Sequence, residues 1–95
     1  MNAAPTVADH PDDHRYEIEL EGRRIGLLTY RIDGDVIAFT HAEVDPSVGG
    51  RGFGSALART ALDDARDRGL KIRPLCPFVA DFVSNHEDEY GDLVA

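Results

Sequence analysis

The stretch VDPSVGGRGFGSAL, residues 44–57, decides how the rest of the chain is interpreted. Four of its glycines stand within six positions, between an apolar run and the start of a helical pattern. Glycines let backbone amides approach an anion closely, and the dipole of a helix N-terminus favours negative charge. Arg51 can add a charged side-chain contact. The stretch therefore predicts a phosphate or pyrophosphate site, and a tight turn that allows close helix packing is the alternative.

Two other phosphate-binding loops do not fit this stretch. A Walker A loop needs a Gly-Lys-Ser or Gly-Lys-Thr sequence, which does not follow here. A dinucleotide-binding site needs repeated strand–helix–strand units, whereas several consecutive strand patterns precede this loop. The loop is therefore expected to belong to a different kind of α/β protein.

The residues that follow the loop have a helical pattern. Apolar side chains recur at helical spacing from Phe53 to Ala65, which predicts a helix over 52–68. Gly69 suits the left-handed residue that ends a helix, and Leu70 can then fold back onto Ala65.

Upstream of the loop the pattern is that of strands. Residues 15–20, 24–32 and 36–44 are rich in alternating or β-branched apolar side chains, and Asp33-Gly34 is a strong two-residue hairpin signal. We expect these strands to form an antiparallel meander. Residues 1–13 hold little that could pack, which predicts a flexible N-terminal tail before a single domain over 14–95.

Downstream of the helix the chain returns to the sheet. Residues 70–76 predict a fourth strand, and Pro74 limits its regular part. Pro77 suits the first position of a second helix, predicted over 77–86. A helix between two neighbouring strands makes a right-handed crossover with parallel pairing. The fold class is therefore α/β (α+β), with a mixed sheet and helices packed against it.

Composition narrows the function classes. The chain has 95 residues, 42% hydrophobic and 29% charged, with a formal net charge of −8. This acidity argues against nucleic acid as a partner, since phosphate backbones need a cationic footprint. Neither an apolar run of membrane-spanning length nor a signal-like start is present, so we expect a cytoplasmic protein without a membrane partner. The single cysteine excludes an internal disulfide, and the four scattered histidines predict no metal site.

The motif VDPxxxGRGFGSAL resembles the acetyl-coenzyme A motif of the GCN5-related N-acetyltransferases. His41 just before it, PLCPFV at 74–79 and EYGDLV at 89–94 resemble the minimal YjdJ-like or NATD1-like branch of that superfamily. The resemblance covers about residues 15–94. It implies a trimmed GCN5-related acetyltransferase fold that lacks the helices and the final hairpin enclosing the acceptor in larger relatives.

The resemblance also implies a cofactor site for acetyl-CoA. The strand edge Ala42–Val44, with Ala42 and Val44 as its predicted contacts, would pair with the pantetheine arm. Gly49 departs from the motif, which usually has Arg or Gln there, so one side-chain contact is missing. The loop residues that would cradle the pyrophosphate are Gly50, Arg51, Gly52, Phe53, Gly54 and Ser55.

Cys76 and His41 are the residues predicted to carry chemistry. Cys76 precedes a helix, where a thiolate is favoured, and the resemblance places a Cys and a His at these positions in the branch. His41 alternates with Ile37 and Phe39, so its ring is expected on the face that those residues bury. Imidazole could act as a general base for an amine or for the thiol. The alternatives are that Cys76 is a small buried apolar residue and that His41 is a half-buried structural histidine.

The sequence thus predicts an acetyl-CoA-dependent N-acetyltransferase that acetylates a primary amine of a protein, a polyamine or a small molecule. Direct transfer and an acetyl-cysteine route both remain open. The alternative function is a non-catalytic coenzyme A or acyl-CoA binding module that acts as a sensor or a partner subunit, and a redox or scaffold protein is a third. The acceptor, and whether the chain is a monomer or a homodimer, are undecided.

Overall fold

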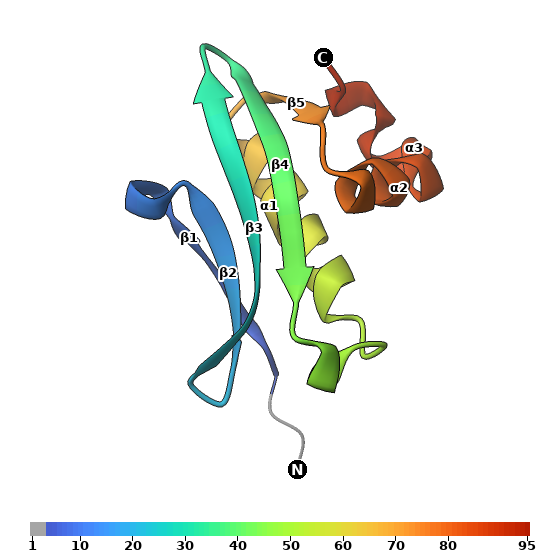
Figure 1. Ribbon diagram of the computed structural model, residues 1–95. Coiled ribbons are helices and arrows are strands. Elements are labelled where there is room, and N and C mark those ends of the chain that lie inside the picture. The colour runs from blue at the N-terminus through green and yellow to red at the C-terminus, as the bar shows by residue number, and fades with distance from the viewer. Residues whose placement is uncertain (1–3) are drawn as a thin grey trace.

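The computed structural model describes residues 4–95, which form one five-stranded sheet with helices packed against it (Figure 1). Strand order follows the chain, antiparallel from β1 to β4, and β5 pairs parallel with β4. This confirms the predicted mixed α+β fold. The strands are β1 (Thr6–His10), β2 (Arg15–Leu20), β3 (Arg23–Asp33), β4 (Val36–Val44) and β5 (Lys71–Pro74); the α-helices are α1 (Phe53–Asp67), α2 (Pro77–Asn85) and α3 (Glu87–Tyr90); short 3-10 helices are η1 (Pro11–Asp13), η2 (Pro46–Val48) and η3 (Gly91–Leu93).

The local signals place these elements well. Gly34 has a φ of 64°, as the predicted hairpin turn between β3 and β4 requires. Gly69 has a φ of 71°, and the Leu70 N–H donates to the Ala65 carbonyl at 2.9 Å, which is the expected end of α1. None of the helices in residues 4–95 is long and apolar enough to cross a membrane.

The N-terminal segment differs from its prediction. Residues 6–10 were expected in a flexible tail, but they form β1 and pair with residues 15–19 of β2. Val7 packs against the core, and Asp9 accepts a hydrogen bond from the Tyr30 hydroxyl at 2.6 Å. One core-facing apolar residue is too little for a period-2 pattern, so β1 depends on its partner strand. The part of the predicted tail at 1–3 lies outside the described residues.

The helices gather on one face of the sheet. The helix α1 packs against β2, β3 and β4 through its buried apolar stripe, and α2 lies beside it, next to β5 (Figure 1). In residues 4–95 no α-helix covers the opposite face, which we call the open face (Figure 1). The core therefore lies between one face of the sheet and the helices.

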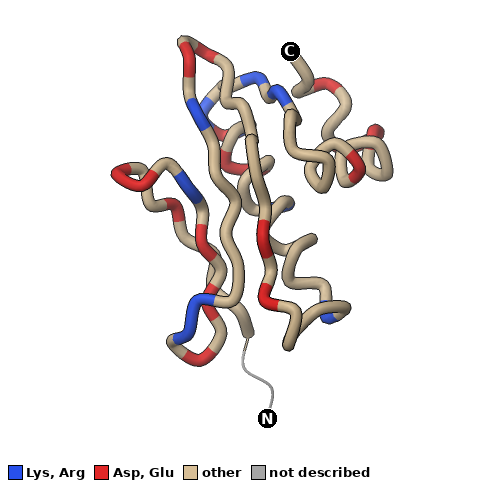
Figure 2. Tube along the Cα trace, in the orientation of Figure 1, with Lys and Arg blue, Asp and Glu red and all other residues tan. Residues whose placement is uncertain are grey.

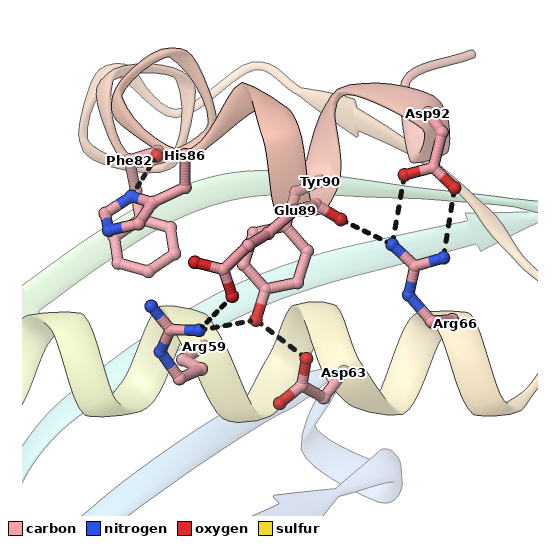
Figure 3. A network of polar contacts seen from close by, with 8 residues as sticks. All are labelled: Arg59, Asp63, Arg66, Phe82, His86, Glu89, Tyr90 and Asp92. Atoms are coloured by element: carbon pink, nitrogen blue, oxygen red, sulfur yellow. Dashed lines mark hydrogen bonds and ion pairs between the residues drawn. The ribbon is translucent and has the colours of Figure 1, made fainter.

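The acidic C-terminal segment is fastened to α1 by charged contacts (Figure 3). The Arg59 guanidinium is 2.7 Å from the Glu89 carboxylate, and Arg66 donates to both carboxylate oxygens of Asp92 at 3.0 Å (Figure 3). The Tyr90 hydroxyl donates to Asp63 at 2.7 Å. These contacts hold α3 and η3 against α1, on the side away from the open face.

Candidate functional site

The strands β4 and β5 separate halfway along β4. Their pairing runs from Val36 opposite Lys71 to Phe39 opposite Pro74. The Cys76 N–H then donates to the Phe39 carbonyl at 2.9 Å, and the chain turns away into α2. Residues 40–44 of β4 therefore lie beside a gap that the first turns of α1 and α2 border.

A bulge in β4 changes which side chains face this gap. Thr29 lies opposite His41 and Tyr30 lies opposite Phe39, so Thr40 is an extra residue in β4. Beyond the bulge the alternation shifts by one position.

The prediction that the His41 ring points to the face buried by Phe39 is therefore wrong. Ala42 and Val44 are half-buried and pack against the core, whereas His41 and Glu43 stand on the open face. The position of the bulge depends on the partner strand β3, which the alternation within β4 does not report.

A continuous groove runs from the glycine loop along β4. One part, about 220 Å³, is lined by β4, Gly54, Leu57 and Phe78. A second part, about 260 Å³, follows the loop and shares Val44, Gly54 and Phe78 with the first. We call the two parts together the loop–strand groove. Of the residues predicted to bind the cofactor, those that line it are Ala42, Val44, Gly50, Gly52, Phe53, Gly54 and Ser55.

The predicted loop residue that does not line the groove is Arg51. Its guanidinium lies 5.2 Å from the centre of the Phe53 ring. Arg51 is exposed, so its side chain can reach an anion at the loop only from the solvent side.

The glycine loop leaves the start of α1 open. Gly50 and Gly52 have φ values of 78° and 80°, a left-handed conformation that other residues rarely adopt. No side chain caps α1, and its first backbone hydrogen bond runs from the Ala56 N–H to the Gly52 carbonyl. The N–H groups of the first turn, which have no partner within a helix, therefore face the end of the groove.

A turn before the loop fixes the direction in which the chain leaves β4. The Ser47 N–H donates to the Asp45 carboxylate at 2.9 Å and opens η2. This backbone hydrogen bond lowers the pKa of Asp45 below its usual value. The hydrogen bond therefore favours the charged form of the Asp45 carboxylate at the turn from which the loop starts.

Phe78 is a groove residue that the sequence reasoning missed. Its ring lies over Gly54, and an added Cβ there would be 2.8 Å from the Phe78 Cζ. The ring is 41% exposed although it follows the buried Cys76 closely in sequence. An apolar pair, Phe78 and Val79, at the start of a helix was the signal, because only one of two adjacent helical residues can face the core.

The two residues predicted to carry chemistry lie on different sides of β4. Cys76 is 3% exposed and belongs to the core cluster, where it precedes α2. The His41 side chain is 62% exposed, and its Nε2 lies 3.6 Å from a carboxylate oxygen of Glu43. Both flank the point where β4 and β5 separate, but the structure does not bring thiol and imidazole into contact.

One group of side chains on β1 and β2 has the composition of a metal site. His10, Glu17 and Glu19 each offer a ligand atom within 4.8 Å of the others. However, Arg15 donates to Glu17 at 2.6 Å and Arg24 lies 3.5 Å from it. These guanidinium groups neutralise the carboxylate that a cation would need, so we assign no metal to this group.

Comparisons with known proteins identify a family and several similar structures. The GCN5-related N-acetyltransferase family model matches residues 15–93. A GCN5-like protein from Staphylococcus aureus is 28% identical with a TM-score of 0.70, over 95% of this chain and 87% of that one. Rv2747 from Mycobacterium tuberculosis, solved in complex with CoA, is 28% identical with a TM-score of 0.56, over 85% of this chain and 45% of that one.

A more distant structure shares the fold alone. The ribosomal-protein-S18-alanine N-acetyltransferase from Escherichia coli is 20% identical with a TM-score of 0.59, over 61% of this chain and 38% of its own. No curated protein sequence matches the chain.

Proposed function

Because the chain belongs to the GCN5-related N-acetyltransferase family, we propose that it transfers the acetyl group of acetyl-CoA to a primary amine. The observation that carries this proposal is the loop–strand groove, which joins an open helix N-terminus to the separated edge of β4. The helix N-terminus at one end of the groove suits the pyrophosphate of acetyl-CoA, and the strand edge suits the long arm that carries the thioester. Rv2747, which is crystallised with CoA, supports the choice of cofactor.

The residues of the groove suit the parts of acetyl-CoA. The first-turn amides of α1 and the helix dipole would hold the pyrophosphate, with Arg51 adding charge from the solvent side. The edge of β4 at Ala42–Val44 would pair with the pantetheine amides, and the Phe78 ring would cover the pantetheine arm. When bound, acetyl-CoA supplies an activated acetyl group at the point where β4 and β5 separate.

On the direct route, the amine reacts from the open face. Its nitrogen forms a bond to the acetyl carbon while the C–S bond breaks, and the electron pair of that bond leaves on the CoA sulfur. The nitrogen loses one proton, and we assign that proton to His41, which is exposed on the open face beside Glu43. Backbone N–H groups of β4 beyond the bulge would stabilise the negative charge on the carbonyl oxygen.

The acetyl-cysteine route needs an additional movement. Cys76 is 3% exposed in the core, so its sulfur must become accessible before it can attack a thioester. This burial favours direct transfer. Cys76 then has a structural role at the point where β4 and β5 separate. Its N–H bond to Phe39 involves only the backbone, so a Cys76→Ala protein should keep the split.

A second function is favoured by two observations. The groove has Gly49 where the motif usually has a long polar side chain, and thiol and imidazole are not assembled together. Both fit a coenzyme A or acyl-CoA binding module without efficient turnover.

Within the family, we place the chain in the minimal YjdJ-like or NATD1-like branch from its PLCPFV and EYGDLV segments, and we expect it in the cytoplasm.

The first test is calorimetric titration with acetyl-CoA, followed by intact mass spectrometry of the same sample. Binding without a mass gain, followed by acetylation of an amine, supports direct transfer. A gain of one acetyl group that disappears in Cys76→Ala would establish the covalent route instead. Binding without transfer to any amine supports the binding module, and no binding would overturn both functions. Position 52 has a φ of 80°, so Gly52→Ala is expected to weaken binding, whereas Gly22→Ala, at a residue with a φ of 79° that does not line the groove, is not.

The proton transfer has its own test. With His41 as the base, kcat/KM should rise with pH, because only the base without its proton can accept one from the amine. His41→Gln should remove that rise and lower kcat by about a hundredfold, within the usual range for a general base. A pH profile that is the same in both proteins would assign the proton to another group.

A further inference from the structure

Within the described residues, two arginines without an ion-pair partner lie on either side of β4 on the open face. Arg31 on β3 and Arg73 on β5 lie opposite the same β4 residue, Ala38. The neighbouring rows contain Phe39 and Ile37, which are fully buried on the helix side. Since successive side chains of a strand alternate between faces, the row of Ala38 faces away from the helices. We call this row, Arg31–Ala38–Arg73, the arginine row.

The lack of partners is unusual in this acidic chain. Among residues 4–95, neither Arg31 nor Arg73 has a carboxylate within 4.0 Å or a side-chain hydrogen bond, although both are exposed. Apart from Arg51, which lies over the Phe53 ring, each of the other arginines has a carboxylate in that range. The paired ones are Arg15, Arg23, Arg24, Arg59, Arg66 and Arg68. With a net charge of −8, the chain offers many carboxylates, so these two charges are left available.

The residue between the two arginines has a small side chain. Ala38 has only a methyl group, and it is 7% exposed although it belongs to the uncovered face. Two strand spacings separate the Cα atoms of Arg31 and Arg73, about 10 Å in total. Two guanidinium groups at that spacing can hold one oxyanion between them. Figure 2 shows basic segments on β3 and β5, with an uncharged part of β4 between them.

The arginine row lies next to the proposed point of acetyl transfer. Ala38 directly precedes Phe39, whose carbonyl accepts the Cys76 N–H where β4 and β5 separate. His41 lies three residues further along β4, about 10 Å from Ala38 at most. An amine that reacts between these two points can therefore place a negative group of the same molecule on the row.

From this placement we propose that the acceptor is an amine that also carries an oxyanion, a carboxylate or a phosphate, which Arg31 and Arg73 bind. The proposal rests on the acetyltransferase function above and names its substrate class. Guanidinium groups suit both oxyanions through paired N–H donors. Because the row is exposed, salt should weaken this recognition. Polyamines, which the open groove alone would admit, are expected to be poor acceptors.

The kinetic test uses matched amines that differ in the oxyanion. For carboxylate, γ-aminobutyrate is compared with butylamine, and for phosphate, O-phosphoethanolamine with ethanolamine. The wild-type protein should prefer at least one anionic member of these pairs. Arg31→Gln and Arg73→Gln should each lower its kcat/KM by about tenfold, the effect of one charged hydrogen bond. Both should leave the KM for acetyl-CoA and the rate with the neutral amine unchanged.

The matched control is Arg24→Gln, which removes one exposed charge from the same strand but has Glu17 as its partner. An equal loss in this variant, or an equal loss for neutral amines in Arg31→Gln, would overturn the proposal. So would a preference for the neutral member of both pairs.

A binding measurement separates this proposal from the enzymatic one. The isotope-labelled protein is titrated with γ-aminobutyrate and with O-phosphoethanolamine while amide shifts are recorded by NMR. Shifts centred on Ala38 that disappear in the Arg31→Gln/Arg73→Gln double variant support the arginine row even when acetyl-CoA is neither bound nor used. If neither compound shifts these amides, the row is not an acceptor site, whatever the result with acetyl-CoA.

Discussion

The ring of Phe78 lies over Gly54 so closely that a side chain at position 54 would overlap it, with its Cβ 2.8 Å from the Phe78 Cζ. This contact joins the first turn of α1 to the first turn of α2, and both residues line the two parts of the groove. The width of the groove therefore depends on a residue that has no side chain.

Gly54→Ala should change the groove more than the stability of the fold. The Phe78 ring is 41% exposed and can move aside, so we expect the free energy of unfolding to fall by less than about 1 kcal/mol. The affinity for acetyl-CoA should fall because the displaced Phe78 ring would no longer cover the pantetheine arm. Calorimetry and thermal unfolding of the same protein measure both effects. In a Phe78→Ala background the effect of Gly54→Ala should vanish, and a loss that persists there would assign it to the helix instead.

Gly49 is a position where cofactor affinity can be increased. Its φ of −63° suits any residue, and an added Cβ would meet only the Pro46 carbonyl oxygen, at 3.4 Å. Gly49→Arg should tighten acetyl-CoA binding by about threefold to tenfold, since it adds one charge-assisted hydrogen bond at the loop. Titration calorimetry at low and high salt measures the gain, which salt should reduce. Gly49→Ala is the control and should bind as the wild type does.

The tyrosines predict how the protein responds to alkali. All three are buried, and each hydroxyl donates to an aspartate: Tyr16 to Asp64, Tyr30 to Asp9, and Tyr90 to Asp63. Burial, and secondly the neighbouring carboxylate, raises the pKa of Tyr90 to about 12 and those of Tyr16 and Tyr30 further.

A raised pKa in the folded state means stability that is complete below pH 10 and is lost as pH rises through the folded values. The folded protein should therefore show no tyrosinate absorbance near pH 10, and ionisation should coincide with unfolding. In denaturant all three should ionise near pH 10. A step near pH 10 in the folded protein would show that at least one hydroxyl is accessible.

The C-terminal segment should loosen in acid before the sheet does. Hydrogen bonds from Arg59 and Arg66 lower the pKa values of Glu89 and Asp92 below 4.5 and 3.8 respectively. Lowered values mean stability that is complete above those pH values and is lost as pH falls through the folded ones. Hydrogen exchange should therefore rise first at the Ala95 N–H, which donates to the Ile72 carbonyl.

Arg66→Gln should produce part of that loosening at neutral pH. Arg31→Gln removes a charge without a carboxylate partner and is the control for exchange at the C-terminus. Equal exchange in both variants would mean that the ion pairs of Figure 3 do not hold the segment.

Part of this fold could be read from short-range patterns. The hairpin at Asp33-Gly34, the apolar stripe of α1 and the Gly69 stop each depend on a few neighbouring residues, and the structure has them where they were expected. The glycine loop belongs to the same class, because a positive φ at Gly50 and Gly52 is a local requirement. The loop residues that line the groove, Gly50, Gly52, Phe53, Gly54 and Ser55, follow from this requirement, whereas Ala42 and Val44 face the groove because of the bulge at Thr40.

Other features depend on which segments pair. The strand β1 has little apolar pattern of its own and exists because β2 offers it an edge. The bulge at Thr40 is a mismatch between β3 and β4, and it alone moves the His41 ring to the open face.

The order of strands and helices, the glycine loop and the family are therefore predictable from the amino-acid pattern, because they follow from local spacing and backbone preference. Which residues share a site depends on long-range pairing of the strands. The tertiary structure places Cys76 in the core and His41 beside Glu43, and it brings Arg31 and Arg73, forty-two positions apart in sequence, to either side of Ala38. The physical reason is that register between strands is set by pairing along the whole sheet, and a shift of one residue exchanges the two faces.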